Sequence, residues 1–220
     1  MISLAAAAET LSISYTTVAR RVQRAEQALG RPLFERRPEG YAPTSEARDL
    51  AEAAADGALH KLWYTTIPNA ALIPAEIDRR LGLRKAGSMM PFAIIDAKSG
   101  RAEGMTTYMN IDQANKRVEI GSTWYRKSVQ GSGLNTECKL LMLTHAFETL
   151  GCIVVEFRTH FINHQSRRAI ERLGAKLDGV LRNNMIMADG SLRDTAVYSI
   201  IASEWPMVRT HLNWQIEKHH

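Results

Sequence analysis

Residues 118–151 read VEIGSTWYRKSVQGSGLNTECKLLMLTHAFETLG, and this stretch decides the fold. Residues 118–125 alternate with the period of two that predicts a strand. The loop over 130–133 follows, where two glycines without a Cβ allow backbone amides to approach a ligand closely. A helix is predicted next, ended by Gly151 and carrying one apolar stripe of Leu140, Leu143, Phe147 and Leu150. Amides that converge on a helix N-terminus form a ready phosphate site.

This stretch resembles the acetyl-CoA motif of the GNAT superfamily of acetyl-CoA-dependent N-acetyltransferases. Gln130 and Gly133 match its Gln/Arg-x-x-Gly-x-Gly/Ala loop, whereas Asn135 departs from the last position. The run Gly-Leu-Asn-Thr-Glu over 133–137 is similar to the RimJ/RimL branch, which acetylates protein N-termini and small amines. The resemblance covers about residues 49–206. It implies an α/β (α+β) fold in which helices flank a central mixed, mostly antiparallel sheet.

The resemblance also implies acetyl-CoA as co-substrate. In this family a splayed strand faces the pantetheine arm, the glycine loop binds the pyrophosphate, and a second Asn-x-x-Ser motif opens a later helix. The matching residues are Thr123, Trp124, Tyr125, Gln130, Gly131, Gly133, Leu134, Asn135, Thr136, Asn163, Ser166 and Arg167. A plain tight turn is the alternative interpretation of the glycines, and a helix cap is the alternative for Ser166.

Glu119 is the first candidate for the catalytic base. It lies eleven residues before Gln130, the offset at which several histone-type GNAT enzymes place a general base. Strict alternation would put Glu119 on the same strand face as Thr123. A structural carboxylate is the alternative, and Glu156 on the next predicted strand is a second candidate.

The second catalytic role is that of the general acid, which protonates the leaving thiolate. Many GNAT enzymes carry a tyrosine seven residues after the motif asparagine, and here that position is Ile170. The proton for the leaving thiolate must then come from Ser166, from water or from elsewhere. Tyr198, on a later predicted strand, is interpreted as a core residue.

The N-terminus has a second resemblance. Residues 14–44, SYTTVARRVQRAEQALGRPLFERRPEGYAPT, are similar to the winged helix-turn-helix of LysR-type regulators, which extends over 3–47 here. The resemblance implies a small β-wing around Pro38-Glu39-Gly40. It also implies DNA contacts from Ser14, Tyr15, Thr16, Thr17, Arg20 and Arg21.

Two features argue against tight DNA binding by this segment. The first helix of the LysR motif is absent ahead of Met1, and residues 1–48 hold seven Arg against five Glu, a formal charge of only +2. Such a charge is weak for a phosphate-binding surface. A packed helical pair with a solvated basic face is the alternative, and we predict weak DNA binding or none.

Two segments are therefore predicted, a LysR-like one over 1–48 and an acetyltransferase-like one over 49–220. No Pro/Gly/Ser linker separates them, and residues 59–64 are interpreted as the first helix of the second segment. Residues 40–44 can serve as wing strand for one half and as first strand for the other. A natural fusion and an engineered chimera are both compatible with this junction.

The remaining pattern predicts a helix over 73–86, strands over 91–96, 103–111 and 153–158, and a loop over 160–164. A helix over 165–173 follows, then a hairpin of strands 180–187 and 195–202 around Asp189-Gly190, and a last helix from Pro206. Three tryptophans, Trp63, Trp205 and Trp214, are interpreted as core and packing residues.

Composition narrows the choice of partners. The 220 residues carry a formal charge of +5 and are 45% hydrophobic, as in a globular protein that favours anionic partners such as coenzyme A or nucleic acid. Two cysteines make neither a disulfide framework nor a metal quartet, and His160 with His164 is half a zinc site at most, so no metal is expected. No segment is apolar enough to span a membrane, and a cytoplasmic protein is expected. A coenzyme A ester and an amine are the expected partners, and a homodimer is compatible with the sequence.

Overall fold

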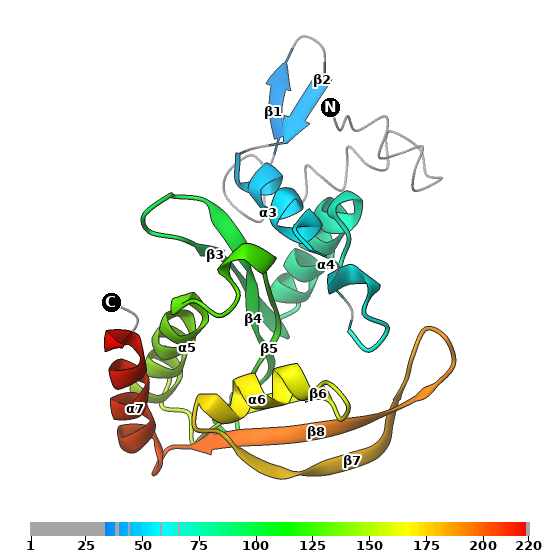
Figure 1. Cartoon of the computed structure of the whole chain (residues 1–220). Coiled ribbons are helices and arrows are strands. Elements are labelled where there is room, and N and C mark those ends of the chain that lie inside the picture. Colours follow the sequence, from blue (N-terminus) through cyan, green and yellow to red (C-terminus); the bar gives the residue numbers. More distant parts are fainter. Residues whose placement is uncertain (1–33, 38–39, 44, 58, 66, 219–220) are drawn as a thin grey trace. The chain divides into compact units, whose positions relative to one another are not determined.

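The computed structural model describes residues 34–37, 40–43, 45–57, 59–65 and 67–218 (Figure 1). Strands β1 (Phe34–Arg37) and β2 (Gly40–Pro43) pair antiparallel, which confirms the hairpin predicted for the wing. In the described residues β2 pairs in this two-stranded sheet and does not join the larger sheet. The predicted helices before it, and all six residues with predicted DNA contacts, lie outside the described residues.

Helices α3 (Ser45–Ala55) and α4 (Ile73–Lys85) precede the large sheet. The helix predicted over 73–86 is confirmed, and Pro74 stands in its first turn, where a missing N–H does no harm. The helix predicted from Leu59 is wrong, because only a 3₁₀ turn, Leu59–Lys61, forms there. Gly57, with φ +97°, follows the end of α3 in a conformation that stops a helix.

The large sheet has six strands in the order β3-β4-β5-β6-β8-β7. Their bounds are β3 Met89–Ile95, β4 Ala102–Asp112, β5 Arg117–Tyr125, β6 Val154–His160, β7 Lys176–Ile186 and β8 Leu192–Ile201. Strands β5 and β6 are parallel, whereas β8 pairs antiparallel with both β6 and β7. The mixed sheet and the β7–β8 hairpin are therefore as predicted. His160, predicted to begin a loop, is instead the last residue of β6.

Three helices pack on one face of strands β5, β6 and β8, namely α5 (Leu134–Thr144), α6 (His164–Arg172) and α7 (Trp205–Glu217) (Figure 1). Leu143 of the predicted α5 stripe is fully buried, but Leu150 is 52% exposed. The α-helix gives way to a π-helical turn over His145–Thr149, which moves Leu150 out of the stripe. Gly151 then ends the helix with φ +63°, as predicted.

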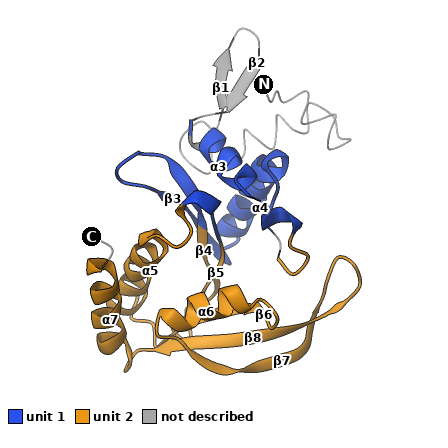
Figure 2. Cartoon of the chain, viewed as in Figure 1, with its two compact units in different colours: residues 1–61, 66–105, 124–128 blue, residues 62–65, 106–123, 129–220 orange. Residues whose placement is uncertain are grey.

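The chain divides into two compact units, and the division passes through β4 and β5 (Figure 2). The first unit has a core of Leu50, Ala53, Ala54, Ile73, Ile77, Leu81, Ala102, Met105 and Trp124. The second unit has a larger core from α5, α6, α7 and the apolar face of β5, β6 and β8. Each unit thus buries its own apolar residues. The boundary predicted between residues 48 and 49 stays a prediction.

The tryptophans differ from expectation. Trp205 is 5% exposed and stacks on Phe147 with the ring centroids 5.3 Å apart, as predicted for a packing residue. Trp63 and Trp214 are 56% and 50% exposed, so their assignment to the core was wrong. Among the described residues, no helix has the length and apolarity that crossing a membrane requires.

Candidate functional site

The glycine loop leads directly into the N-terminus of α5. Gly131 has φ +82°, a conformation that a residue with a Cβ adopts only under strain. The hydroxyl of Ser132 donates to the carbonyl of Val129 at 2.7 Å and accepts the Leu134 amide at 3.3 Å. Gly133 is the N-cap of α5 and makes no side-chain capping bond. The first-turn amides and the positive end of the helix dipole suit an anion such as a phosphate.

Strands β5 and β6 separate in the middle of their length. Their parallel register runs from Arg117↔Val154 to Glu119↔Glu156 and ends there. Strand β5 nevertheless continues to Tyr125 and β6 to His160. Beyond Glu119 and Glu156 the facing backbone groups are therefore not paired with each other in this ladder. Such edges can hydrogen-bond an extended ligand laid between them, and the splayed strand predicted here is confirmed.

The alternation of β5 changes phase at Ser122, which has φ +47°. Val118 and Ile120 point into the core beneath α5, so Glu119 between them points to the opposite face. After Ser122, however, Thr123 again points towards α5, where its hydroxyl meets Lys139. The prediction that Glu119 and Thr123 share a strand face is therefore wrong, because an irregular residue inside a strand shifts the period.

Glu119 is a buried carboxylate, 5% exposed. Asn110 donates to its Oε2 at 2.7 Å, and the Arg158 guanidinium lies 3.5 Å from the same atom. Burial raises the pKa of Glu119, and Asn110, Arg158 and Arg193 oppose that rise. A carboxylate with a raised pKa is a better proton acceptor than an exposed one.

Glu156, the second candidate base, is committed to ion pairs. Its carboxylate binds Arg158 at 2.9 Å and also pairs with Arg117. It is 7% exposed, so both candidates are buried. Within the described part of the chain, Glu119 has a longer contact to Arg158 and one neutral donor, Asn110, so it is less tightly ion-paired than Glu156.

The second motif is organised by Asn163, which caps α6. Its side chain accepts the backbone N–H of Ser166 at 3.1 Å, so Asn163 and not Ser166 supplies the helix cap. The Ser166 side chain is half-buried in the first turn. Ile170, at the position where the family often has tyrosine, is buried in the core of the second unit.

Arg167 is engaged inside the same unit. Its Nε donates to the hydroxyl of Tyr198 at 2.8 Å, and its guanidinium lies 4.7 Å from the centre of the Phe161 ring. The Tyr198 hydroxyl in turn donates to Glu171 at 2.7 Å. Tyr198 is fully buried, as predicted, and burial raises its pKa. Arg167 therefore joins α6 to β8 and to the loop after β6.

Trp124 and Tyr125 belong to the first unit and are 4% and 9% exposed. Trp124 is part of that unit's core. A Cβ added to Gly104 would lie 2.2 Å from the Trp124 carbonyl, so only glycine allows β4 to approach β5 this closely. The other predicted cofactor-binding residues lie in the second unit, namely Thr123, Gln130, Gly131, Gly133, Leu134, Asn135, Thr136, Asn163, Ser166 and Arg167.

Lys139 is a buried cation that the sequence pattern did not predict. It is 4% exposed on the inner side of α5, and its ammonium donates to Thr106 at 2.9 Å and to Thr123 at 3.2 Å. Those two hydroxyls are 2.8 Å apart. Burial lowers the pKa of Lys139 to about 8. Lys139 lies four residues before Leu143 and so shares the helix face of the apolar stripe. This spacing was the sequence signal that could have predicted its burial.

Across the part of the chain that the structure describes, no group of three or more His, Cys, Asp or Glu side chains could hold a metal ion. His164 is exposed at the start of α6, whereas His160 is buried at the end of β6. The two histidines therefore differ in environment.

Comparison with known proteins gives two family matches. Residues 41–176 match the family described as "Acetyltransferase (GNAT) domain". Residues 2–48 match "Bacterial regulatory helix-turn-helix protein, lysR family". The first match covers more than half of the chain and includes the glycine loop, α5 and α6.

Individual relatives agree with the first match. The chain is 33% identical over 102 residues to YdaF of Bacillus subtilis, named as a candidate ribosomal N-acetyltransferase, and this match covers 46% of the chain and 55% of YdaF. It thus spans little more than half the length of that curated relative. A solved GCN5-related N-acetyltransferase from Brucella melitensis is 30% identical, with a TM-score of 0.70 over 78% of this chain and 77% of that one. Mycobacterium smegmatis RimJ, solved with CoA-disulfide, shares the fold at 24% identity and TM-score 0.62, over 79% of this chain and 87% of that one.

Proposed function

The chain belongs to the GNAT family of acetyltransferases, and from that premise we propose that it transfers the acetyl group of acetyl-CoA to a primary amine. The observation that carries this proposal is the arrangement of the second unit. A glycine loop opens α5 without a side-chain cap, and β5 and β6 separate beside Glu119. Phosphate groups and an extended thioester arm are the ligands that fit such features.

We expect the amides of residues 131–136 to receive the pyrophosphate of the coenzyme. The helix dipole adds about 0.3–1 kcal/mol to the binding of such an anion. The edge of β5 beyond Ser122 would hydrogen-bond the pantetheine arm. Asn163 and Ser166, at the start of α6, would lie along the same arm. Acetyl-CoA, when bound, supplies the thioester that is attacked.

The acceptor must be a neutral amine before it attacks. An α-amine with a pKa near 8 is deprotonated at neutral pH at a cost of about 1 kcal/mol, whereas a lysine near 10.4 needs about 4–5 kcal/mol. A single buried carboxylate such as Glu119 is sufficient for the first acceptor. YdaF is named as a candidate ribosomal N-acetyltransferase, which supports an amine acceptor. We therefore propose protein N-termini or small amines as acceptors, attacking directly in a ternary complex.

The thiolate that leaves must gain a proton. The Tyr198 hydroxyl already donates to Glu171, and position 170 is an isoleucine in the core. Ser166 at the first turn of α6 therefore stays our candidate for this proton, directly or through water.

The direct test is release of free CoA from acetyl-CoA against a panel of amines and N-terminal peptides. Binding is tested separately by calorimetry with Gly133→Val, whose bulky side chain should block the approach of a phosphate and weaken coenzyme binding severely. Gly179→Val is the matched control. Gly179 lies in β7, outside the glycine loop, and a Cβ added there meets nothing within 4 Å. Equal coenzyme affinity in the two folded variants would show that the loop does not bind the coenzyme.

The match of residues 2–48 to the LysR family favours a second candidate function. In this alternative the chain is a DNA-binding regulator, and its acetyltransferase-like part senses an acyl-CoA without turnover. Both functions use the glycine loop in the same way. Turnover is what separates them, since a sensor binds the coenzyme but releases no free CoA with any amine.

A further inference from the structure

Two buried polar atoms on neighbouring strands have no hydrogen-bond partner among the described residues. His160 ends β6 and is 6% exposed, and Thr195 of β8, its partner in the strand register, is 1% exposed. The unpaired atoms are Nε2 of His160 and Oγ1 of Thr195. Proteins rarely bury polar atoms without partners, so two such atoms on adjacent strands point to a group that arrives from outside.

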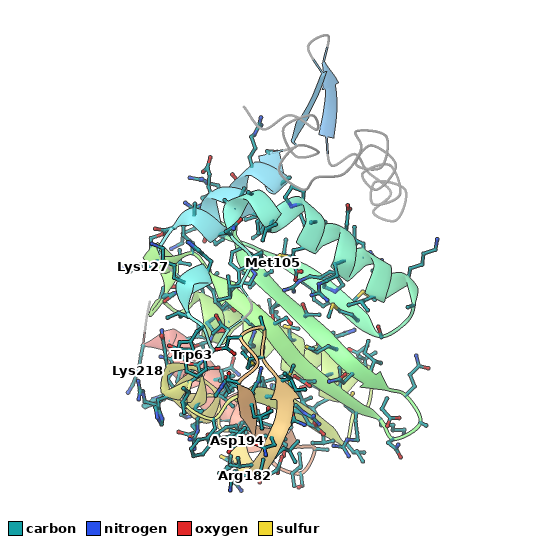
Figure 3. The ribbon with its side chains drawn as sticks, turned by 90° about the vertical axis from the view of Figure 1, so that its right-hand side faces the viewer. Trp63, Met105, Lys127, Arg182, Asp194 and Lys218 are labelled. Carbon is teal, nitrogen blue, oxygen red and sulfur yellow. The ribbon has the colours of Figure 1, made fainter. Side chains whose placement is uncertain are left out.

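The other ring nitrogen decides what His160 can offer. Nδ1 accepts the backbone N–H of Ile162 at 3.3 Å, which assigns the proton of a neutral ring to Nε2. Burial lowers the pKa of His160, the guanidinium of Arg193 lowers it further, and the carboxylate of Asp194 opposes both. Asp194 is itself held by Arg182 across the β7–β8 hairpin at 2.8 Å (Figure 3). At neutral pH the ring is thus uncharged, and Nε2–H is a donor.

Both groups lie on the sheet face that carries the candidate base. In β6, Arg158 and His160 alternate with core residues and so point away from the helices. The Arg158 guanidinium contacts the Glu119 carboxylate at 3.5 Å on this face. Arg193 is close enough to shift the pKa of both Glu119 and His160. An amine beside Glu119 is therefore on the same side of the sheet as the two unpaired atoms.

Aromatic rings complete the surroundings of His160. The Trp63 ring meets it edge-on with the centroids 5.4 Å apart, and the Tyr64 ring lies 6.4 Å away. Trp63 is 56% exposed and is labelled in Figure 3. Aromatic rings beside hydrogen-bonding groups on one sheet face are the usual construction of a small-ligand subsite.

We propose that His160 and Thr195 bind an oxygen atom of the amine acceptor, either a peptide carbonyl or a side-chain hydroxyl, while the amine lies at Glu119. The donor character of Nε2 and the hydroxyl of Thr195 suit an oxygen, which has two lone pairs to accept both bonds. The guanidinium of Arg193 disfavours a second cation in this place. The inference deepens the proposed function and rests on it. It makes the chain selective for peptide-like acceptors over plain alkylamines.

The test compares three acceptors with wild type and Thr195→Val, which keeps the side-chain shape and removes the hydroxyl. The acceptors are a tripeptide amide beginning with serine, one beginning with alanine, and n-propylamine. We expect kcat/KM for the peptides to fall about threefold to tenfold, the effect of one lost hydrogen bond, with no change for propylamine. A fall for both peptides assigns the oxygen to a carbonyl, and a fall for the serine peptide alone assigns it to the hydroxyl.

Thr159→Val is the matched control. Thr159 is the neighbour of His160 on β6, is equally buried at 6% exposure, and points to the opposite face of the strand. It should leave the ratio of peptide to propylamine activity unchanged. His160→Phe keeps an aromatic ring against Trp63 and should lower the same ratio as Thr195→Val does. An unchanged ratio in Thr195→Val and His160→Phe would overturn the proposal.

The subsite can also be tested if the chain has no acetyltransferase activity. If wild type releases no CoA with any amine, calorimetry of the serine and alanine tripeptides with the CoA-bound protein replaces the kinetic measurement. Peptide binding that weakens in Thr195→Val but not in Thr159→Val would support the subsite in a chain that is not an acetyltransferase. Equal peptide binding in both variants, or none in wild type, would refute the subsite.

Discussion

Lys139 brings a charge into the inner side of α5, and its burial should be visible in the pH dependence of stability. Its pKa falls from 10.5 to about 8 in the folded chain. Between these pH values the unfolded chain binds more protons, so the free energy of unfolding rises as pH rises from 8 to 10.5. Below pH 8 the full penalty of the buried charge is present, about 3 kcal/mol as an upper limit.

Lys139→Met should therefore raise the free energy of unfolding by about 1–3 kcal/mol at pH 7. This gain is reduced by the free energy of the two hydrogen bonds that the hydroxyls of Thr106 and Thr123 no longer receive. The advantage should shrink towards pH 10, where wild type buries a neutral amine. Denaturant unfolding at pH 7, 8.5 and 10 measures both effects. Lys85→Met, at an exposed position in the last turn of α4, is the control and should show no such trend. A pH-independent difference for Lys139→Met would refute the charge argument.

Glu119 should matter most when little free amine is present. Glu119→Gln keeps the size of the side chain and removes the basic carboxylate beside Asn110. We expect turnover to fall by roughly tenfold to a hundredfold, near the low end of general-base contributions. The loss should shrink as pH rises, because the acceptor then deprotonates in solution. Initial rates from pH 6 to 9 test this, and full activity of the variant throughout that range would make Glu119 structural.

At the scale of the element, two glycines with equally open surroundings should respond in opposite ways to alanine. Neither Gly82 nor Gly151 would bring a new Cβ within 4 Å of another group. Gly82 lies inside α4, where alanine should add about 0.5–1 kcal/mol to the free energy of unfolding. Gly151 has φ +63°, and alanine there should subtract about 1–2 kcal/mol. Denaturant unfolding of Gly82→Ala and Gly151→Ala compares them, and effects of the same sign would contradict this account.

At the scale of the whole molecule, the N-terminal segment raises the question of DNA. The chain has a charge of +5, but residues 1–48 hold only +2 of it. We therefore expect the full chain to bind duplex DNA weakly, without sequence preference, and with an affinity that falls steeply with salt. Selection from a randomised duplex library at physiological salt is the measurement. Enrichment of one sequence with nanomolar affinity would show that the segment is a specific DNA reader.

The sequence by itself determined the features that depend on neighbours along the chain. Period-two alternation placed the strands, and the glycines at 131, 133 and 151 marked the loop and the end of the helix. The hairpin at Asp189-Gly190 and the helix over 73–86 were predictable for the same reason, since turn chemistry and helical periodicity are local. The same local signals indicated the GNAT family, because its coenzyme-binding motif lies within one continuous stretch of sequence.

Only the tertiary structure decided which side chains meet and what surrounds them. A positive φ at Ser122 changed the phase of β5, so Glu119 and Thr123 point to opposite faces, which no alternation count could show. Thr195 lies opposite His160 because β8 pairs with β6 across thirty-five positions of sequence. Lys139 is buried because α5 packs on Thr106 and Thr123. Burial and pairing of this kind depend on contacts between distant segments, and a local pattern does not contain them.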